Sequence, residues 1–138
     1  MKPVIGFTAG AWDLLHAGHS VFLTKCFEQC DHMVIGLHTN PKIDRFDKNV
    51  PVQTTFERYL QLRSLNGEAT IVPYDTERDL VNILATIGVN RRFLGSDYEG
   101  KEFTGKAFCE DNNIELVYIP RKHNFSSSEL RNRIKESS

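Results

Sequence analysis

Near its start the chain reads Val4-Ile5-Gly6-Phe7-Thr8-Ala9-Gly10-Ala11-Trp12-Asp13-Leu14-Leu15-His16-Ala17-Gly18-His19, and a run with helical periodicity follows. The apolar residues Val4 to Phe7 predict a buried strand, which puts His16 and His19 at the mouth of the next helix. A helix N-terminus offers unpaired N–H groups and the positive end of the helix dipole. Each imidazole can donate a hydrogen bond or carry a positive charge, and Gly18 lets a ligand approach the backbone. The pattern indicates a phosphate-binding turn.

Apolar strands and helical patterns alternate along the whole chain, which predicts one α/β domain over residues 1–138. We expect strands at Val4–Phe7, His32–Leu37, Ala69–Val72, Arg92–Leu94 and Ile114–Ile119, with Pro73 ending the third. We expect helices at His19–Cys30, Thr54–Leu65, Thr76–Ile87, Gly105–Asn112 and Ser126–Lys135, with Thr54 or Thr55 and Thr76 as caps. Strands buried on both faces predict a Rossmann-like three-layer sandwich with a five-stranded parallel sheet.

Right-handed crossovers bring the carboxyl ends of parallel strands to one edge of the sheet, where ligands bind in such folds. The loop from Thr39 to Gln53 is long and polar, and we interpret it as a functional flap. The segments expected at the ligand edge are Thr8–His19, His38–Lys48, Tyr74, Gly95–Glu99 and Pro120–Ser128.

Composition limits the class of protein. The 138 residues are 40% hydrophobic and 25% charged, with 17 basic and 18 acidic side chains and a net charge of −1. This balance does not favour a nucleic-acid partner, so a phosphate ligand is expected to be small and locally held. No apolar run approaches the roughly 20 residues of a membrane span, and the first residues lack the apolar run of a signal peptide. We therefore expect no membrane partner and a cytoplasmic location, with three reduced cysteines.

Thr8 to His19 resembles the Thr-x-Gly-x-Phe-Asp-x-x-His-x-Gly-His signature of the HxGH nucleotidyltransferases, with Trp12 at the usual Phe position. Gly95–Lys101 and Pro120–Ser128 resemble the remaining blocks of the small cytidylyltransferase branch, especially the glycerol-3-phosphate cytidylyltransferases. The resemblance implies transfer of CMP from CTP to a small phosphorylated polyol such as glycerol 3-phosphate, with release of pyrophosphate. The acceptor is already an oxyanion, so the chemistry needs positioning and charge stabilisation rather than a strong base.

The resemblance and the expected sheet edge together assign roles to individual residues. We expect catalytic roles for His16, His19, Arg121 and Lys48. The residues expected to bind the nucleotide are Thr8, Ala9, Gly10, Gly18, Ser96, Asp97, Arg121, Ser126, Ser127 and Ser128. The serines precede a helical run and offer a second helix N-terminus to phosphate. Those expected to bind the acceptor substrate are Asp13, His38 and Arg58.

The cofactor, partner and alternative functions follow from the same residues. A triphosphate needs a divalent cation, and no Asp/Glu cluster marks a dedicated site, so we expect Mg²⁺ to be carried by the nucleotide. The family resemblance implies a homodimer. Phe125–Arg131 is also similar to the Ser-Ser block of adenylyltransferases, so ATP and a sugar phosphate or another phosphorylated metabolite are the alternative substrates. A non-catalytic nucleotide-binding module is a second alternative; it predicts loss of a histidine, of Arg121 or of the serine run.

Overall fold

One five-stranded parallel sheet organises the residues that the computed structural model describes, which are 2–65, 68–121 and 126–137. The strand order is β3-β2-β1-β4-β5, and each neighbouring pair is parallel. This arrangement confirms the predicted Rossmann-like α/β fold. The order reverses between β1 and β4, where open α/β sheets form a ligand crevice. The strands are β1 (Ile5–Gly10), β2 (His32–His38), β3 (Ala69–Tyr74), β4 (Arg91–Gly95) and β5 (Glu115–Ile119).

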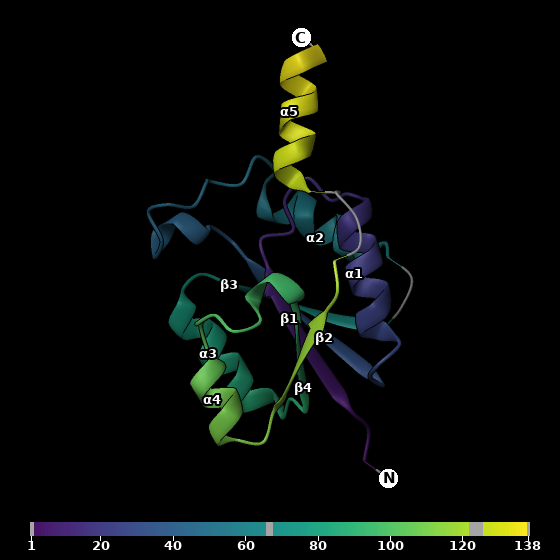
Figure 1. The fold of residues 1–138 in the computed structure, drawn as a ribbon, viewed down its shortest axis with the longest axis vertical. Coiled ribbons are helices and arrows are strands. Elements are labelled where there is room, and N and C mark those ends of the chain that lie inside the picture. The colour runs from purple at the N-terminus through teal and green to yellow at the C-terminus, as the bar shows by residue number, and fades with distance from the viewer. Residues whose placement is uncertain (1, 66–67, 122–125, 138) are drawn as a thin grey trace.

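Helices cover both faces of this sheet. Figure 1 shows α1 on the opposite side of the sheet from α3 and α4, while α5 extends away from the rest of the molecule at the C-terminal end. The helices are α1 (Ala17–Phe27), α2 (Thr55–Arg63), α3 (Glu77–Ile87), α4 (Lys106–Asp111) and α5 (Ser127–Ser137), and two short 3₁₀ turns are η1 (Pro41–Ile43) and η2 (Ser96–Tyr98).

The predicted helix caps are confirmed at the second and third helices. The Thr54 side chain accepts a hydrogen bond from the Glu57 N–H, and the Thr76 side chain accepts one from the Asp79 N–H. At the other end of α3, Gly88 has a φ of 78°, a left-handed conformation that glycine adopts without strain. These local signals set where α2 and α3 begin and where α3 ends.

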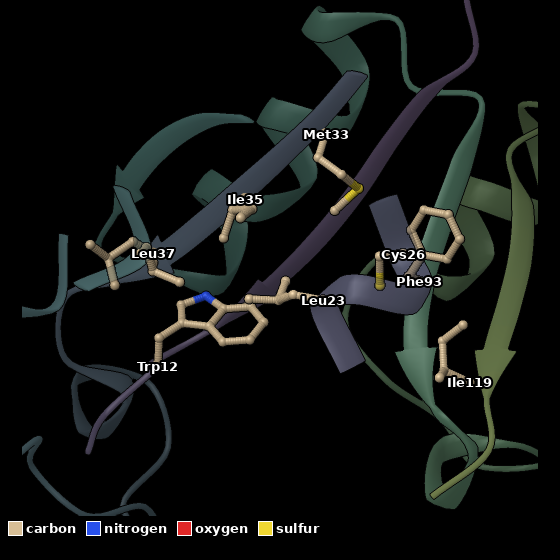
Figure 2. Packing of buried hydrophobic residues seen from close by; sticks show 9 residues of the cluster. Trp12, Leu23, Cys26, Met33, Ile35, Leu37, Phe93 and Ile119 are labelled. Atoms are coloured by element: carbon tan, nitrogen blue, oxygen red, sulfur yellow. The ribbon is translucent and has the colours of Figure 1, made fainter. Parts of the chain in front are cut away.

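Two apolar clusters hold the layers together. The cluster between the sheet and α1 contains Trp12, Leu23 and Phe93, and Figure 2 shows these side chains with Cys26 and Ile35 around them. The cluster on the other face packs Phe7, Val34, Tyr74, Leu80, Leu84 and Cys109 between the sheet and α3 and α4. Burial on both faces explains why the strands read as continuous apolar runs.

The first strand is longer than predicted, and the first helix begins earlier. β1 continues from Phe7 to Gly10, because Thr8, Ala9 and Gly10 pair with the last residues of the neighbouring β2. α1 begins at Ala17 and therefore contains Gly18 and His19, with His16 as its N-cap. Consequently the two histidines occupy the cap and the first turn of the helix.

The prediction that Pro73 ends the third strand is wrong. Pro73 lies inside β3, which continues to Tyr74 and forms one edge of the sheet. The Tyr74 carbonyl accepts a hydrogen bond from the Thr39 N–H on the β2 side, so the nitrogen of Pro73, one residue earlier, faces the open edge. An edge strand tolerates proline there because no ladder hydrogen bond is lost.

Candidate active site

The two histidines of the phosphate-binding turn cap the helix that they introduce. The Gly18 N–H donates to His16 Nδ1 over 2.9 Å, and the His16 N–H donates to His19 Nδ1 over 3.2 Å. The two rings stack with centroids 3.9 Å apart. Because each Nδ1 accepts a hydrogen bond, the proton of each neutral ring sits on Nε2. The local fold therefore orients Nε2 as the donor atom of both imidazoles.

His19 is uncharged at neutral pH. Burial, which is the largest cause, and the nearby His16 together lower its pKa from 6.5 to about 4, although the Asp13 carboxylate partly opposes the shift. A charged His19 was one possibility from the sequence, and this environment favours the neutral form instead. His19 therefore serves as a neutral hydrogen-bond donor and supplies no positive charge at this pH.

The lowered pKa of His19 makes stability fall in mild acid. Between pH 6.5 and pH 4 the unfolded chain binds a proton at this residue that the folded chain does not, so folding loses free energy as the pH falls. We expect the unfolding free energy to drop by about 2 kcal/mol between roughly pH 7.5 and pH 5 through this group. Urea unfolding at both pH values measures the change. The control is His19→Asn, whose side chain can still accept a hydrogen bond from the His16 N–H but does not titrate. If the unfolding free energy of this variant depends on pH as strongly as that of the wild type, the assignment to His19 is contradicted.

A cavity of about 270 Å³ opens beside the histidine turn. Gly95 and Phe22 also line it, so it joins the end of β4 to the first helix. The Arg121 N–H donates to Ser96 Oγ over 3.3 Å, which links the ends of β4 and β5 at this cavity. Predicted site residues that line it are His16, Gly18, His19, Asp97, Arg121 and Ser126.

The serine run contributes to the first cavity through its first member. Ser126 Oγ accepts a hydrogen bond from the Glu129 N–H over 3.1 Å. Ser127 is the first residue of α5, and Ser128 is exposed and is not among the described residues that line the cavity. Residues 122–125, which belong to the family-like block, lie outside the described residues.

A second cavity of about 340 Å³ lies where β1 and β4 diverge, at the switch point of the sheet. It adjoins the first cavity, since His19, Phe22 and Gly95 line both. His38 reaches it with its ring stacked on Tyr74 and its Nε2 within 3.1 Å of the Asp75 carbonyl. The predicted site residues along its walls are Thr8, Ala9, Gly10, His19, His38 and Lys48.

Arg58 does not reach either cavity, which corrects its predicted role in substrate binding. Its side chain is 1% exposed, and the guanidinium donates to backbone carbonyls at the ends of β1 and β2 and before α2. The acceptors are the carbonyls of Ala11, His38, Thr39, Gln53 and Thr54, together with Thr55 Oγ1. These neutral oxygens occupy the N–H donors that were expected to bind substrate, so Arg58 holds three chain segments together.

Asp13 has a similar structural environment. Its carboxylate accepts from the Val52 and Gln53 N–H groups over 2.8 and 3.0 Å and pairs with Arg131 of α5 over 2.9 Å. At 6% exposure it lines neither cavity. The predicted contact with substrate is therefore replaced by a link between the histidine loop, the end of the flap and the last helix.

Backbone strain surrounds this aspartate. Trp12 and Leu14 have φ values of 55° and 50°, a region that bulky residues rarely adopt. Trp12 is held there by burial and by a 2.9 Å hydrogen bond from its indole Nε1 to the Gly36 carbonyl. The loop before the histidines is thus fixed by the core on one side and by Asp13 on the other.

Several residues of the second cavity were not assigned a role from the sequence, although Tyr98 lies within the segment Gly95–Glu99 that was expected at the ligand edge. Arg92, Tyr98, Phe103 and Thr104 line it on the side of α3 and α4. One signal was available: a charged Arg92 stands at the start of an apolar strand that was expected to be buried. The aromatic residues carry no such local signal.

The described residues were also searched for metal sites and membrane spans. Across residues 2–65, 68–121 and 126–137, no three His, Cys, Asp or Glu side chains gather in a way that could hold a metal ion. In the same part of the chain, no helix has the length and apolar character needed to cross a membrane.

Comparison with known proteins gives the family. A family model described as cytidylyltransferase-like matches residues 7–133. The chain belongs to the cytidylyltransferase-like family. Among curated members of related sequence, the bifunctional protein HldE of Wolinella succinogenes is 32% identical over 82% of this chain and 23% of its own length. HldE of Nitrobacter hamburgensis is 29% identical over 91% of the chain and 26% of its own length, so the chain spans about a quarter of these relatives.

Solved structures share the fold of this family member. A lipopolysaccharide core biosynthesis protein from Thermoplasma volcanium superposes with a TM-score of 0.67 at 18% identity, covering 91% of this chain and all of that chain. A pantothenate synthetase from Thermus thermophilus superposes with a TM-score of 0.63 at 13% identity, covering 96% of this chain and 64% of that chain.

Proposed function

We propose that the protein transfers a nucleoside monophosphate from a nucleoside triphosphate to a phosphorylated small molecule and releases pyrophosphate. The observation that carries this proposal is the meeting of two cavities at His19. Two substrates that react with each other need adjoining sites, and a donor side chain belongs at the point where charge develops. Membership of the cytidylyltransferase-like family supports the same reaction.

The reaction itself needs no general base. An ionised oxygen of the acceptor phosphate attacks the α-phosphorus, the bond between the α-phosphorus and the bridging oxygen to the β-phosphate breaks, and its electron pair leaves with pyrophosphate. We assign the triphosphate to the first cavity and the acceptor to the second, with the α-phosphate beside His19. In this assignment Thr8, Ala9 and Gly10, which were expected to bind the nucleotide, line the cavity of the acceptor. The Nε2 atoms of His16 and His19 donate to the phosphate oxygens as charge accumulates. Arg121 and the α5 end at Ser126 stabilise the departing phosphates.

In this proposal, Lys48 and Mg²⁺ compensate the remaining negative charge of the two phosphate-bearing substrates. Lys48 belongs to the flap and lines the second cavity, where it faces an incoming anion. We propose that the triphosphate carries Mg²⁺, because the described residues gather no three-ligand cluster for a protein-held ion and a single carboxylate, Asp97, lines the first cavity. Bound in this way, the ion neutralises part of the charge on the triphosphate.

CTP and a polyol phosphate such as glycerol 3-phosphate remain the first choice of substrates within this proposal. ATP with a sugar phosphate is the second candidate, favoured by the similarity of the block that includes Ser126 and Glu129 to adenylyltransferases. The non-catalytic alternative is disfavoured because both histidines, Arg121 and Ser126 are present around one cavity. The homodimer and the cytoplasmic location remain predictions.

The test is the release of pyrophosphate from each of the four common nucleoside triphosphates with Mg²⁺ and a panel of polyol and sugar phosphates. We expect pyrophosphate to form only when an acceptor is present, with CTP giving the highest kcat/KM. Reactions without acceptor serve as the control for hydrolysis. If only ATP among the four triphosphates gives pyrophosphate with an acceptor, ATP replaces CTP in the proposal. Absence of pyrophosphate from every pair of triphosphate and acceptor would contradict nucleotidyl transfer.

A further inference from the structure

Arg92 is a buried cation without a counter-charge in direct contact. Its side chain is 5% exposed, and its guanidinium lies 4.9 Å from the centre of the Phe103 ring. Nη1 donates to the Thr104 carbonyl, and the side chain also interacts with the Cys109 thiol. Within the described residues its Nε has no hydrogen-bond partner, and no carboxylate lies within ion-pair distance of it. The contacts that Arg92 does make are neutral.

An unpaired guanidinium in the interior is costly. Burying a charge without an opposite charge or a full set of acceptors costs several kcal/mol, and each unsatisfied donor adds to that cost. The same burial lowers the pKa of Arg92, while Glu77 acts on it only through longer-range attraction that raises the pKa. An anion bound in the cavity beside Arg92 would supply the missing negative charge.

The cavity that Arg92 lines carries an excess of positive charge. Three cationic side chains reach it, Arg92 from β4 and Arg45 and Lys48 from the flap, against the single carboxylate of Glu77. Arg45 is partly compensated, since its Nη1 lies 3.9 Å from Glu77. Lys48 has no ion pair in the described part of the chain. The balance of charge on the walls therefore favours an anionic ligand.

Arg92 and the histidines approach the second cavity from different sides of the sheet. Arg92 pairs in register with Phe7, three residues before the carboxyl end of β1 at Gly10, a rise of roughly 10 Å along the strand. Its contacts with Phe103 and Thr104 place the guanidinium on the side of α3 and α4. His19 belongs to α1 on the opposite side. Arg92 and His19 therefore face the second cavity from opposite sides of the sheet, and we take the anion at Arg92 to be a different group from the phosphate that reacts at His19.

We propose that the acceptor carries a second anionic group, a carboxylate or a second phosphate, and that Arg92 binds it; this replaces glycerol 3-phosphate, whose only anionic group is its phosphate, by an acidic phosphorylated acceptor. This inference rests on the proposed function for the position of the reacting phosphate. Lys48 lies over the same cavity and adds to the attraction. Tyr98 and Phe103, whose rings are 6.1 Å apart, form the wall against which the carbon skeleton packs. Arg92 is thus the residue that selects an acidic acceptor over a neutral one.

Binding of matched acceptors tests this proposal without requiring turnover. Isothermal titration calorimetry in the absence of nucleotide compares the affinities of matched compounds. 3-Phosphoglycerate is compared with glycerol 3-phosphate. Glucuronic acid 1-phosphate and glucose 1,6-bisphosphate are each compared with glucose 1-phosphate. We expect at least one doubly anionic member to bind about tenfold or more tightly than its neutral partner, as a charged hydrogen-bonded pair provides. The carboxylate and phosphate arms distinguish the two kinds of anion. Equal affinity within every pair overturns the proposal.

Variants assign the preference to Arg92. In Arg92→Met the preference for the acidic acceptor is expected to disappear, and in Arg92→Lys, which keeps the charge, to survive in part. The matched control is Arg91→Met, because Arg91 is the adjacent residue of β4 and pairs at the surface with Glu115; it should keep the full preference. Thermal unfolding identifies any variant that fails to fold. If Arg92→Met is unfolded, the acceptor preference of Arg92→Lys tests the assignment, and an unchanged preference in this variant contradicts it. An undiminished preference in Arg92→Met overturns the assignment, whereas a failure of the proposed function appears separately as absence of pyrophosphate release.

Discussion

His16→Asn and His19→Asn are each expected to lower the rate of nucleotidyl transfer by about a hundredfold or more while the protein stays folded. The Asn side chain can replace the acceptor role of Nδ1, toward the Gly18 N–H in one variant and the His16 N–H in the other. Asn is among the best N-cap residues, so α1 keeps its start. What each variant loses is the Nε2 donor to which we assign contact with the phosphates. The substitution thus separates the chemical role of each ring from its role in the fold.

Single-turnover release of pyrophosphate, together with thermal unfolding, measures both effects. His32→Asn is the matched control, since the Nε2 of His32 contacts the Thr70 hydroxyl at 2.9 Å and the residue lines neither cavity. It should leave the rate unchanged. His16→Ala is less informative, because loss of the N-cap costs about 1 kcal/mol in addition. Asn variants that turn over at the wild-type rate would remove the histidines from the mechanism.

Arg58→Met is expected to lower the free energy of unfolding by about 3 to 5 kcal/mol. The methionine fills much of the space but donates no hydrogen bond, so the carbonyls of Ala11, His38 and Thr39 lose their donor in a buried region. Urea unfolding measures the loss. Arg63→Met provides the control on the same helix, because Arg63 is exposed and its replacement should cost less than about 0.5 kcal/mol.

The outcome of Arg58→Met also decides between two roles for this arginine. A structural role predicts lower stability, with kcat/KM recovered under conditions where the variant is fully folded. A fully stable variant with a raised KM for the acceptor would instead restore the substrate-binding role that the sequence suggested. The hydrogen bonds from Arg58 to three different chain segments favour the first result.

The sequence was sufficient for the fold because its signals are local and repeated. Apolar runs identified the strands, Thr54 and Thr76 marked helix starts, and the alternation of the two element types required a parallel sheet. The strand ends were less accurate. β1 continues past Phe7 because pairing with the neighbouring β2, which no local pattern reveals, holds Thr8 to Gly10 in extended form.

Parts of the candidate site were predictable for the same reason, and others were not. Parallel topology brings the histidine turn, Arg121 and Ser126 to one cavity, although about a hundred residues separate them. The roles of Arg58 and Arg92 depend on burial by distant segments. One of these arginines is satisfied by carbonyls and the other lacks a counter-charge, a difference that only the folded chain shows.

Pro73 on β3 limits how copies of this protein can associate. Its nitrogen faces the open edge of the sheet and carries no hydrogen, so a strand from another molecule would find a donor missing near the carboxyl end of β3. Proline at such a position disfavours continuous sheet extension and the aggregation that begins with it. If the protein forms a homodimer, this edge is therefore a poor surface for it, and the subunits are expected to meet elsewhere.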